Sequence, residues 1–263
     1  MNAQLPIHDV LDELIRTVQA EQRVVLCAPP GAGKTTVVPL ALLTECGFEG
    51  KIIMLEPRRL AARAAAERMA ASLSEQLGQT IGYRVRGDSK TSNVTKLEVV
   101  TEGILTRMIQ SDPELQGISC IIFDEFHERS LNADLGLALS LEIRDALRDD
   151  LRIVVMSATL DAEPISKLMS DAPVVTSDGR IYPVTPIWLP RPAPTQQRIE
   201  IGINELIHKA LEQTDGSVLV FLPGEREIRN VMRVLSAGLT QDCLLYTSPS
   251  PRDRTRSRMP SSA

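Results

Sequence analysis

The sequence has few aromatic residues: phenylalanine, tyrosine and tryptophan together make up 3% of its 263 residues. Because hydrophobic residues as a whole reach 43%, the core has to be built mainly from aliphatic side chains. No apolar run approaches the roughly 20 residues that cross a membrane, and the N-terminal residues MNAQLP do not resemble a signal peptide. We therefore expect no membrane segment.

An excess of positive charge is also absent. The net charge is −5, so the chain as a whole does not attract nucleic acid, and any such contact must come from local basic clusters. The four cysteines are scattered, without the paired spacing of a metal site. We interpret them as reduced thiols and expect a cytoplasmic protein.

A glycine-rich segment, APPGAGKTT, follows the apolar run Val24–Cys27 and precedes the apolar run Val37–Leu43. Strand, glycine loop, Gly-Lys-Thr and helix together are the context of a phosphate-binding P-loop. The loop amides would face phosphate oxygens, Lys34 the β- and γ-phosphates, and the Thr35 hydroxyl Mg²⁺. The usual pattern begins with glycine where this chain has Ala28. The alternative is a glycine-rich turn before an ordinary helix.

Apolar strand-like runs alternate with helical patterns along the first two thirds of the chain. This alternation predicts an α/β fold with a parallel sheet and a site along the carboxyl edge of its strands. The expected strands after the first are Lys51–Leu55, Thr95–Val100, Ile118–Phe123 and Leu151–Met156. The expected helices are Ile7–Glu21, Glu56 to about Leu77, Thr101 to about Gln110, and Leu131–Leu147.

Six prolines between Asp171 and Pro194 mark a boundary. We assign residues 1–170 to a first domain and residues 171–198 to a proline-rich linker with an edge strand. Residues 199–242 are interpreted as the start of a second α/β unit. Its expected elements are a helix over Ile199–Gln213, a buried strand over Ser217–Leu222 and a helix over Gly224–Leu239.

The tail, residues 243–263, reads CLLYTSPSPRDRTRSRMPSSA and has no hydrophobic periodicity. A disordered basic tail is one interpretation. However, Cys243–Asp253 resembles the translation of a transposase-type DNA sequencing adapter, and Ser257–Ala263 resembles the segment that follows in such an adapter. We therefore expect the natural reading frame to stop near Asp242, and we assign no function to the tail.

Acidic residues follow the predicted strand Ile118–Phe123. Asp124 at a strand end can reach the Mg²⁺ held by Thr35, and Glu125 can orient or deprotonate an attacking water. His127 could link the nucleotide state to a second domain. The alternative, a solvated acidic loop, is disfavoured because the pair follows a P-loop in a sheet of the right type.

Five motifs occur in order: APPGAGKTT, PRRLAAR, TEGIL, DEFHERSL and MSATLD. Together they resemble the DEAH-box helicases of superfamily two, and the DEFH variant is most similar to the bacterial HrpB type. The resemblance covers Leu5 to Asp242. It implies a RecA-like P-loop NTPase domain, followed by an incomplete second RecA-like domain.

The resemblance implies a role for each matching position. It places catalysis at Glu125, Lys34 and His127, with Mg²⁺ as cofactor held by Thr35, Asp124 and Glu125. The ATP-binding residues are Pro30, Gly31, Ala32, Gly33, Lys34, Thr35 and Thr36. Contacts to single-stranded nucleic acid are implied for Pro57, Arg58, Arg59, Thr101, Glu102 and Gly103. Coupling of hydrolysis to strand separation is implied for Ser157, Ala158 and Thr159.

One family segment is missing. No Gln-Arg-x-Gly-Arg-x-Gly-Arg sequence appears, and in this family that segment supplies an arginine finger. Such an arginine can raise the rate of nucleotide hydrolysis by a factor of roughly 10³–10⁵. We therefore expect an N-terminal fragment that binds nucleotide but is weakly active or inactive alone.

The expected function is that of an ATP-dependent nucleic-acid helicase, with RNA as the expected strand. The alternative is a nucleotide-dependent RNA-binding clamp or RNP-remodelling ATPase that does not unwind. A different P-loop enzyme, such as a kinase, is disfavoured by the ordered SAT and TEG motifs. No upstream glutamine motif that would select adenine is evident, so the chain could use another triphosphate in place of ATP.

Overall fold

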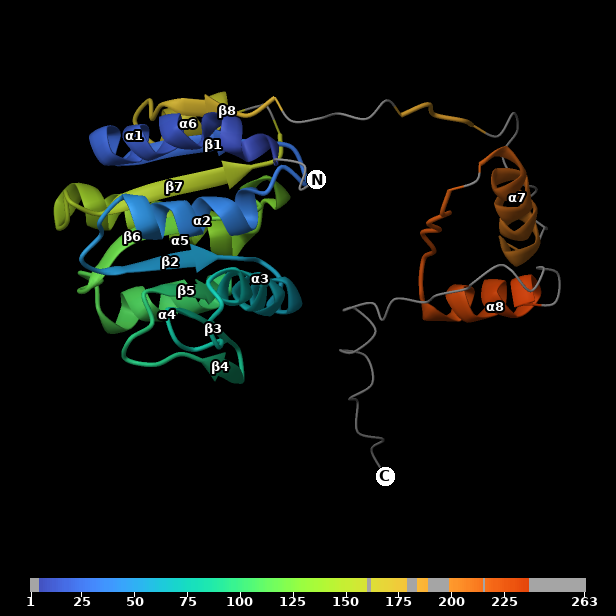
Figure 1. Cartoon of the computed structure of the whole chain (residues 1–263), viewed down its shortest axis with the longest axis horizontal. Helices are drawn as coiled ribbons and strands as arrows, with labels where there is room; N and C mark the ends of the chain where they lie inside the picture. Colours follow the sequence, from blue (N-terminus) through green and yellow to red (C-terminus); the bar gives the residue numbers. More distant parts are fainter. Residues whose placement is uncertain (1–4, 160–161, 179–183, 189–198, 215, 237–263) are drawn as a thin grey trace. The chain divides into compact units, whose positions relative to one another are not determined.

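The computed structural model describes residues 5–159, 162–178, 184–188, 199–214 and 216–236 (Figure 1). The chain divides into two compact units, Met1–Pro183 and Val184–Ala263. Cys243 and the predicted adapter-derived tail lie outside the described residues, as does most of the predicted linker. None of the helices in the described ranges combines the length and apolar character that a membrane span needs.

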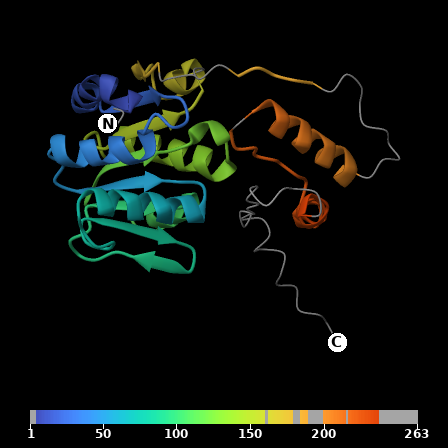
Figure 2. The ribbon, with the colours of Figure 1, turned by 45° about the vertical axis from the view of Figure 1, so that its right-hand side comes forward.

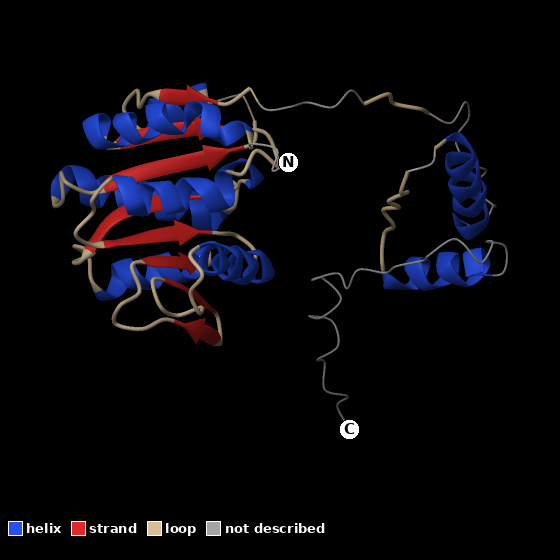
Figure 3. Ribbon diagram, viewed as in Figure 1, coloured by secondary structure: helices blue, strands red, loops and turns tan. Residues whose placement is uncertain are grey.

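The first unit contains a mostly parallel sheet in the order β4-β3-β5-β2-β6-β7-β1-β8 (Figure 3). Only β3 and β4 pair antiparallel. The strands are β1 Arg23–Cys27, β2 Lys51–Leu55, β3 Ile81–Val85, β4 Asp88–Lys90, β5 Leu97–Val100, β6 Ile118–Phe123, β7 Arg152–Ser157 and β8 Val174–Thr176. The predicted parallel α/β sheet is therefore confirmed.

Helices cover both faces of this sheet (Figure 2). Alternate residues of each strand point to opposite faces, so Val24 belongs to one hydrophobic core and Val25 to the other. The first core is closed by η1 Pro6–Val10, α1 Leu11–Glu21, α2 Lys34–Glu45 and α3 Arg59–Ser72. The second is closed by α4 Glu102–Ser111, α5 Leu131–Ala146 and α6 Glu163–Leu168.

Several predicted bounds need correction. The helix expected over Ile7–Glu21 begins with the 3-10 turn η1, and α1 starts only at Leu11. The helix expected to reach about Leu77 ends at Ser72, because Ser74 adopts a left-handed φ of 57° that stops the helix. The short elements β3, β4 and α6 were not predicted. β8 lies at the edge of the sheet, within residues 171–198, where an edge strand was expected.

The second unit contains α7 Ile199–Gln213 and α8 Glu225–Ser236. These two helices pack through a small core of Ile207, Val231 and Leu235. The buried strand predicted over 217–222 is wrong: the segment is not in a strand, and Leu219 and Phe221 are 78% and 87% exposed. A strand needs neighbours to pair with, and the described part of this unit offers none.

Candidate active site

The five sequence motifs follow five neighbouring strands. In spatial order, Thr101 follows β5, Pro57 follows β2, Asp124 follows β6, Ala158 follows β7 and Ala28 follows β1. Because these strands are parallel, their carboxyl ends meet at one edge of the sheet. The topology therefore gathers the predicted site residues along that edge.

The glycine loop connects β1 to α2. Gly31 and Gly33 have φ angles of 78° and 100°, a region that glycine adopts without steric cost. A Cβ on Gly33 would also lie 2.8 Å from Cδ1 of Leu5, and the Ile7 amide donates to the carbonyl of Ala32 at 3.2 Å. The N-terminal segment thus holds the loop from one side. The loop leads into the amino end of α2, where free backbone N–H groups favour an anion.

Lys34 is the first residue of α2 and is buried. Its Nζ lies 3.0 Å from Oε1 of Glu125. A buried ammonium group needs such a partner because desolvation without one is costly. The predicted lysine and the predicted water-orienting carboxylate are therefore in direct contact.

His127 extends this contact to the SAT residues. Its Nε2 lies 3.4 Å from Oε2 of Glu125, and its Nδ1 accepts a hydrogen bond of 3.2 Å from the Ala158 amide. An accepting Nδ1 places the ring proton on Nε2, facing Glu125. The hydroxyls of Ser157 and Thr159 lie 3.0 Å apart, and Ser157 is fully buried.

Asp124 is buried beside these groups. Its Oδ1 accepts a hydrogen bond of 2.8 Å from the Glu125 amide, while Oδ2 is buried without a hydrogen-bond partner. Burial, with a smaller contribution from the charge of Glu125, raises the pKa of Asp124 to about 6, although the Thr35 hydroxyl and Lys34 oppose the shift. An orphaned carboxylate oxygen near a hydroxyl fits a hard cation such as Mg²⁺.

Glu56 is a buried carboxyl group that the sequence analysis did not single out. It follows β2, is 4% exposed and precedes Pro57. Burial, reinforced by the negative charge of Asp124, raises the pKa of Glu56 to about 8. The only signal in the sequence is an acidic residue directly after an apolar strand.

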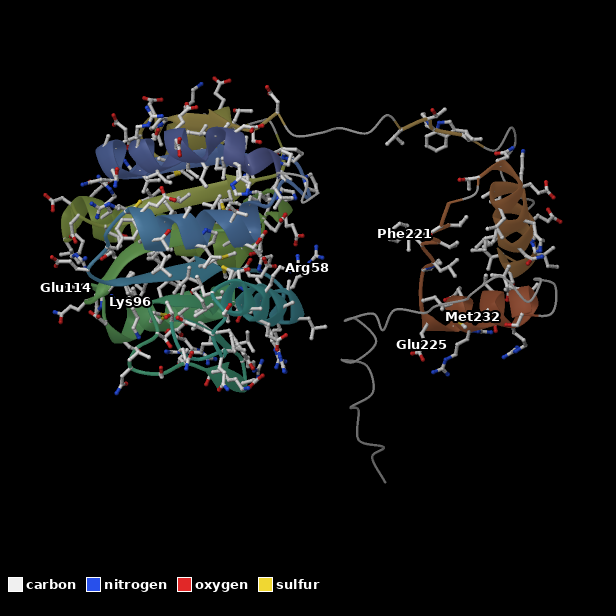
Figure 4. The ribbon with its side chains drawn as sticks, viewed as in Figure 1. Arg58, Lys96, Glu114, Phe221, Glu225 and Met232 are labelled. Atoms are coloured by element: carbon white, nitrogen blue, oxygen red, sulfur yellow. The ribbon has the colours of Figure 1, made fainter. Side chains whose placement is uncertain are left out.

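The predicted nucleic-acid residues lie farther along the edge. Arg58 and Arg59 are exposed at the start of α3, and the side chain of Arg58 projects from the ribbon (Figure 4). The half-buried Thr101 is the N-cap residue of α4, and Glu102 and Gly103 form its first turn. None of these side chains contacts Lys34 or Glu125 through a hydrogen bond or ion pair within the described chain.

Two residues to which the sequence analysis assigned no role contact the predicted nucleic-acid-binding residues. Arg58 forms an ion pair with Glu128, and the Ser130 hydroxyl donates a hydrogen bond of 2.6 Å to Glu102. Glu128 directly follows the DEFH segment, and Ser130 lies two residues further on. The sequence shows that both belong to the DEFHERSL motif, but it does not show their partners, which depend on which strands are neighbours.

The sheet, the glycine loop and the acidic motif together define a P-loop NTPase of RecA-like fold. A profile of the DEAD/DEAH box helicase family matches residues 9–168. The chain belongs to this family, which confirms the resemblance found in the motifs.

Named relatives agree with this assignment. The chain is 48% identical to "ATP-dependent RNA helicase HrpB" of Escherichia coli (strain K12) over 98% of its length, and this covers 32% of that protein. It is 37% identical to "ATP-dependent RNA helicase HrpA homolog" of Haemophilus influenzae over 88% of its length, covering 18% of that protein.

A solved structure is similar over nearly the whole chain. The crystal structure of Escherichia coli DEAH/RHA helicase HrpB matches with a TM-score of 0.85 at 48% identity, covering 98% of this chain and 33% of that one. The chain therefore spans about a third of the length of its HrpB relatives.

Proposed function

We propose that this chain carries the nucleotide-hydrolysing centre of an ATP-dependent RNA helicase. The observation that carries the proposal is the continuous path of contacts from Lys34 through Glu125 and His127 to Ala158. Such a path joins a phosphate-binding loop to a second motif of the same sheet edge. The printed names of the relatives support ATP as the nucleotide and RNA as the nucleic acid.

The glycine loop would bind the phosphates of ATP through its backbone N–H groups, from Gly31 to Thr36. Lys34 would then exchange its contact with Glu125 for the β- and γ-phosphates. Thr35 and Asp124, with Glu125 close by, would hold Mg²⁺, which supplies charge neutralisation to the phosphates when bound. The unpartnered Oδ2 of Asp124 is the atom best suited to that ligand position.

Glu125 would orient the water that attacks the γ-phosphate, because release of Lys34 leaves its carboxylate free to accept a proton. Because His127 contacts both Glu125 and Ala158, it would transmit a movement of Glu125 to Ala158 and to the neighbouring Ser157 and Thr159. Arg58, Arg59 and the start of α4 would bind the backbone of single-stranded RNA, since arginine and helix N-terminal amides suit phosphate without reading bases.

We also place the protein in the cytoplasm. The free cysteines Cys27, Cys46 and Cys120 support a reducing compartment.

The test is ATP hydrolysis with and without single-stranded RNA, measured on this chain, on Glu125→Gln, and on a longer product extended past Asp242. We expect RNA-stimulated turnover in the longer product and its loss in the Glu125→Gln form. Glu67→Gln, an exposed acid on α3, is the matched control and should retain turnover. Full turnover in Glu125→Gln would refute the assigned role.

Strand displacement by the longer product separates the helicase from the alternative clamp or remodelling ATPase. Unwinding of a duplex that depends on ATP supports the helicase. RNA-stimulated hydrolysis without displacement of any strand would favour the alternative.

A further inference from the structure

The turn η2, Phe126–Glu128, lies between Lys34, which is predicted to bind the nucleotide, and Arg58, which is predicted to bind RNA. Its preceding residue, Glu125, contacts Lys34, whereas its last residue, Glu128, pairs with Arg58. The Glu128 amide donates a hydrogen bond of 2.9 Å to the Glu125 carbonyl. One short turn therefore carries a carboxylate toward each of the two groups.

The conformation of this turn is unusual at both ends. Glu125 and Arg129 flank it with left-handed φ angles of 51° and 46°, which non-glycine residues adopt at a cost. The buried Phe126, the first residue of the turn, makes an edge-to-face contact with Phe123 at 6.1 Å. The turn is thus packed against the sheet at its start, between the two acidic residues Glu125 and Glu128.

Arg58 and Arg59 provide an internal comparison. Both are exposed at the start of α3 and both are predicted to bind RNA phosphate. Arg58 is paired with Glu128, whereas no acidic residue of the described ranges forms an ion pair with Arg59. A phosphate must therefore displace a carboxylate at Arg58 but not at Arg59.

We propose that Glu128 is a positioning residue that occupies Arg58 in the nucleotide-free chain and competes there with the phosphate of single-stranded RNA. Nucleotide binding draws Lys34 away from Glu125 and, through the shared turn, weakens the hold of Glu128 on Arg58. This inference rests on the proposed function. It assigns Glu128 the role of linking the occupancy of the P-loop to the availability of one arginine.

The expected effect is modest because the pair is partly solvated. The side chains of Arg58 and Glu128 are 66% and 33% exposed. Ion pairs of this kind contribute little to stability, so removing the competitor should tighten RNA binding by about two- to fivefold. The effect should vanish when Arg58 itself is absent.

The experiment measures binding of a short fluorescein-labelled oligouridine to the full chain at low salt and without nucleotide. We expect Glu128→Gln to bind about two- to fivefold more tightly than the unchanged chain. Glu67→Gln is the matched control: it removes the same charge from the exposed Arg63–Glu67 pair on α3 and should leave affinity unchanged. A gain in both variants would mean a general charge effect and overturn the proposal.

A double-mutant cycle makes the assignment specific to one arginine. Glu128→Gln should give no gain in an Arg58→Ala background but its full gain in an Arg59→Ala background. A gain that persists without Arg58 would overturn the proposal. With a non-hydrolysable ATP analogue and Mg²⁺, the difference between Glu128→Gln and the unchanged chain should shrink; an unchanged difference would refute the link to the P-loop.

Failure of the proposal can be told from failure of the proposed function. If the unchanged chain binds the oligouridine and Glu128→Gln binds it equally well, only the competition is refuted. If no variant binds the RNA while the chain still binds the ATP analogue, the RNA-binding part of the proposed function fails, and the proposal with it.

Discussion

Two segments of this chain have nearly the same local pattern but different structures. In the first unit, Val24–Cys27 is followed by a Pro-Pro-Gly loop and α2; in the second, residues 217–222 are followed by Pro223, Gly224 and α8. The first segment is the buried strand β1. The second is not a strand, and Phe221 is 87% exposed.

The difference lies in the neighbours, not in the apolar residues. β1 pairs with β7 on one side and with β8 on the other. No strand of the described second unit pairs with residues 217–222. Because backbone groups of a strand need partners on adjacent strands, an apolar run alone does not form one. A phosphate-binding loop likewise needs a fixed strand before it.

The largest expected effect on stability comes from placing a charge in each of the two segments, β1 and residues 217–222. Val25→Asp puts a carboxylate among fully buried residues of β1 and should cost more than about 4 kcal/mol, enough to prevent folding of the first unit. Phe221→Asp should change stability by less than about 0.5 kcal/mol, because Phe221 already faces solvent.

Urea unfolding followed by far-UV circular dichroism is the suitable measurement. The only tryptophan, Trp188, belongs to the second unit, so its fluorescence does not report on the first. Val25→Ala is the graded control and should cost about 2 kcal/mol. Equal effects of the two aspartates would show that residues 217–222 are as well packed as β1.

Much of the first unit was predictable from local patterns. β2 and β6 have the predicted bounds because each is an apolar run ended by an acidic residue, Glu56 or Asp124. β3 was missed because Gly82 and Arg84 interrupt its apolar pattern. The residues of the P-loop and of the DEFH motif were predicted from the sequence motifs and their context, and the structure brings Lys34 and Glu125 into contact.

The rest of the site depends on the strand order, which the local pattern does not contain. The pairing of Arg58 with Glu128 requires β2 and β6 to be neighbours. Burial is the main cause of the raised pKa of Glu56, and the further contribution of Asp124 depends on β6 being the strand next to β2. Contacts between residues far apart in the sequence, such as Arg58 and Glu128, can therefore be determined only from the folded sheet.

A second test uses the buried carboxyl groups, which in the described chain occur only in the first unit. Burial and then Asp124 raise the pKa of Glu56 from 4.5 to about 8. The folded state therefore favours the neutral form, and this contribution to stability is full below about pH 4.5 and lost as the pH rises through about 8.

Glu56→Gln is always neutral, so it should remove this dependence on pH. At 1.36 kcal/mol per pKa unit, the shift from 4.5 to about 8 can change the free energy of unfolding by at most about 5 kcal/mol. Relaxation of the structure around the charged carboxylate lowers this value. We therefore expect Glu56→Gln to be about 3 kcal/mol more stable than the unchanged chain at pH 9. The two should be similar near pH 4. Glu212→Gln, exposed on α7, should leave the profile unchanged; an identical profile for Glu56→Gln would refute the buried-carboxyl argument.

A third test compares the two Pro-Gly turns as nucleotide sites. Lys34→Met removes the buried ammonium group of the first turn and should weaken ATP binding on the order of 100-fold, about 2.7 kcal/mol. Arg226→Met removes the exposed cation that follows the second turn and should have no effect. Isothermal titration with ATP and Mg²⁺ measures both, and equal losses would mean that the first turn is not the site.

The smallest expected effect concerns how helices begin in the two units. Ser130 caps α5: its hydroxyl accepts a hydrogen bond of 2.9 Å from the Ala133 amide while donating to Glu102. Gly224 precedes α8 and has no side chain to do this. Ser130→Ala should therefore cost about 1 kcal/mol, measured by urea unfolding.

Gly224→Ser should stabilise α8 by only a few tenths of a kcal/mol, because glycine is already a tolerated N-cap residue. Its new Cβ would lie 3.2 Å from a carboxylate oxygen of Glu227, a flexible group that can move aside. Amide exchange in α8 measures this change. A gain above about 1 kcal/mol would show that the start of α8 limits the stability of the second unit. A gain of a few tenths would leave the lack of strand partners for residues 217–222, within the described part of this unit, as the larger cause.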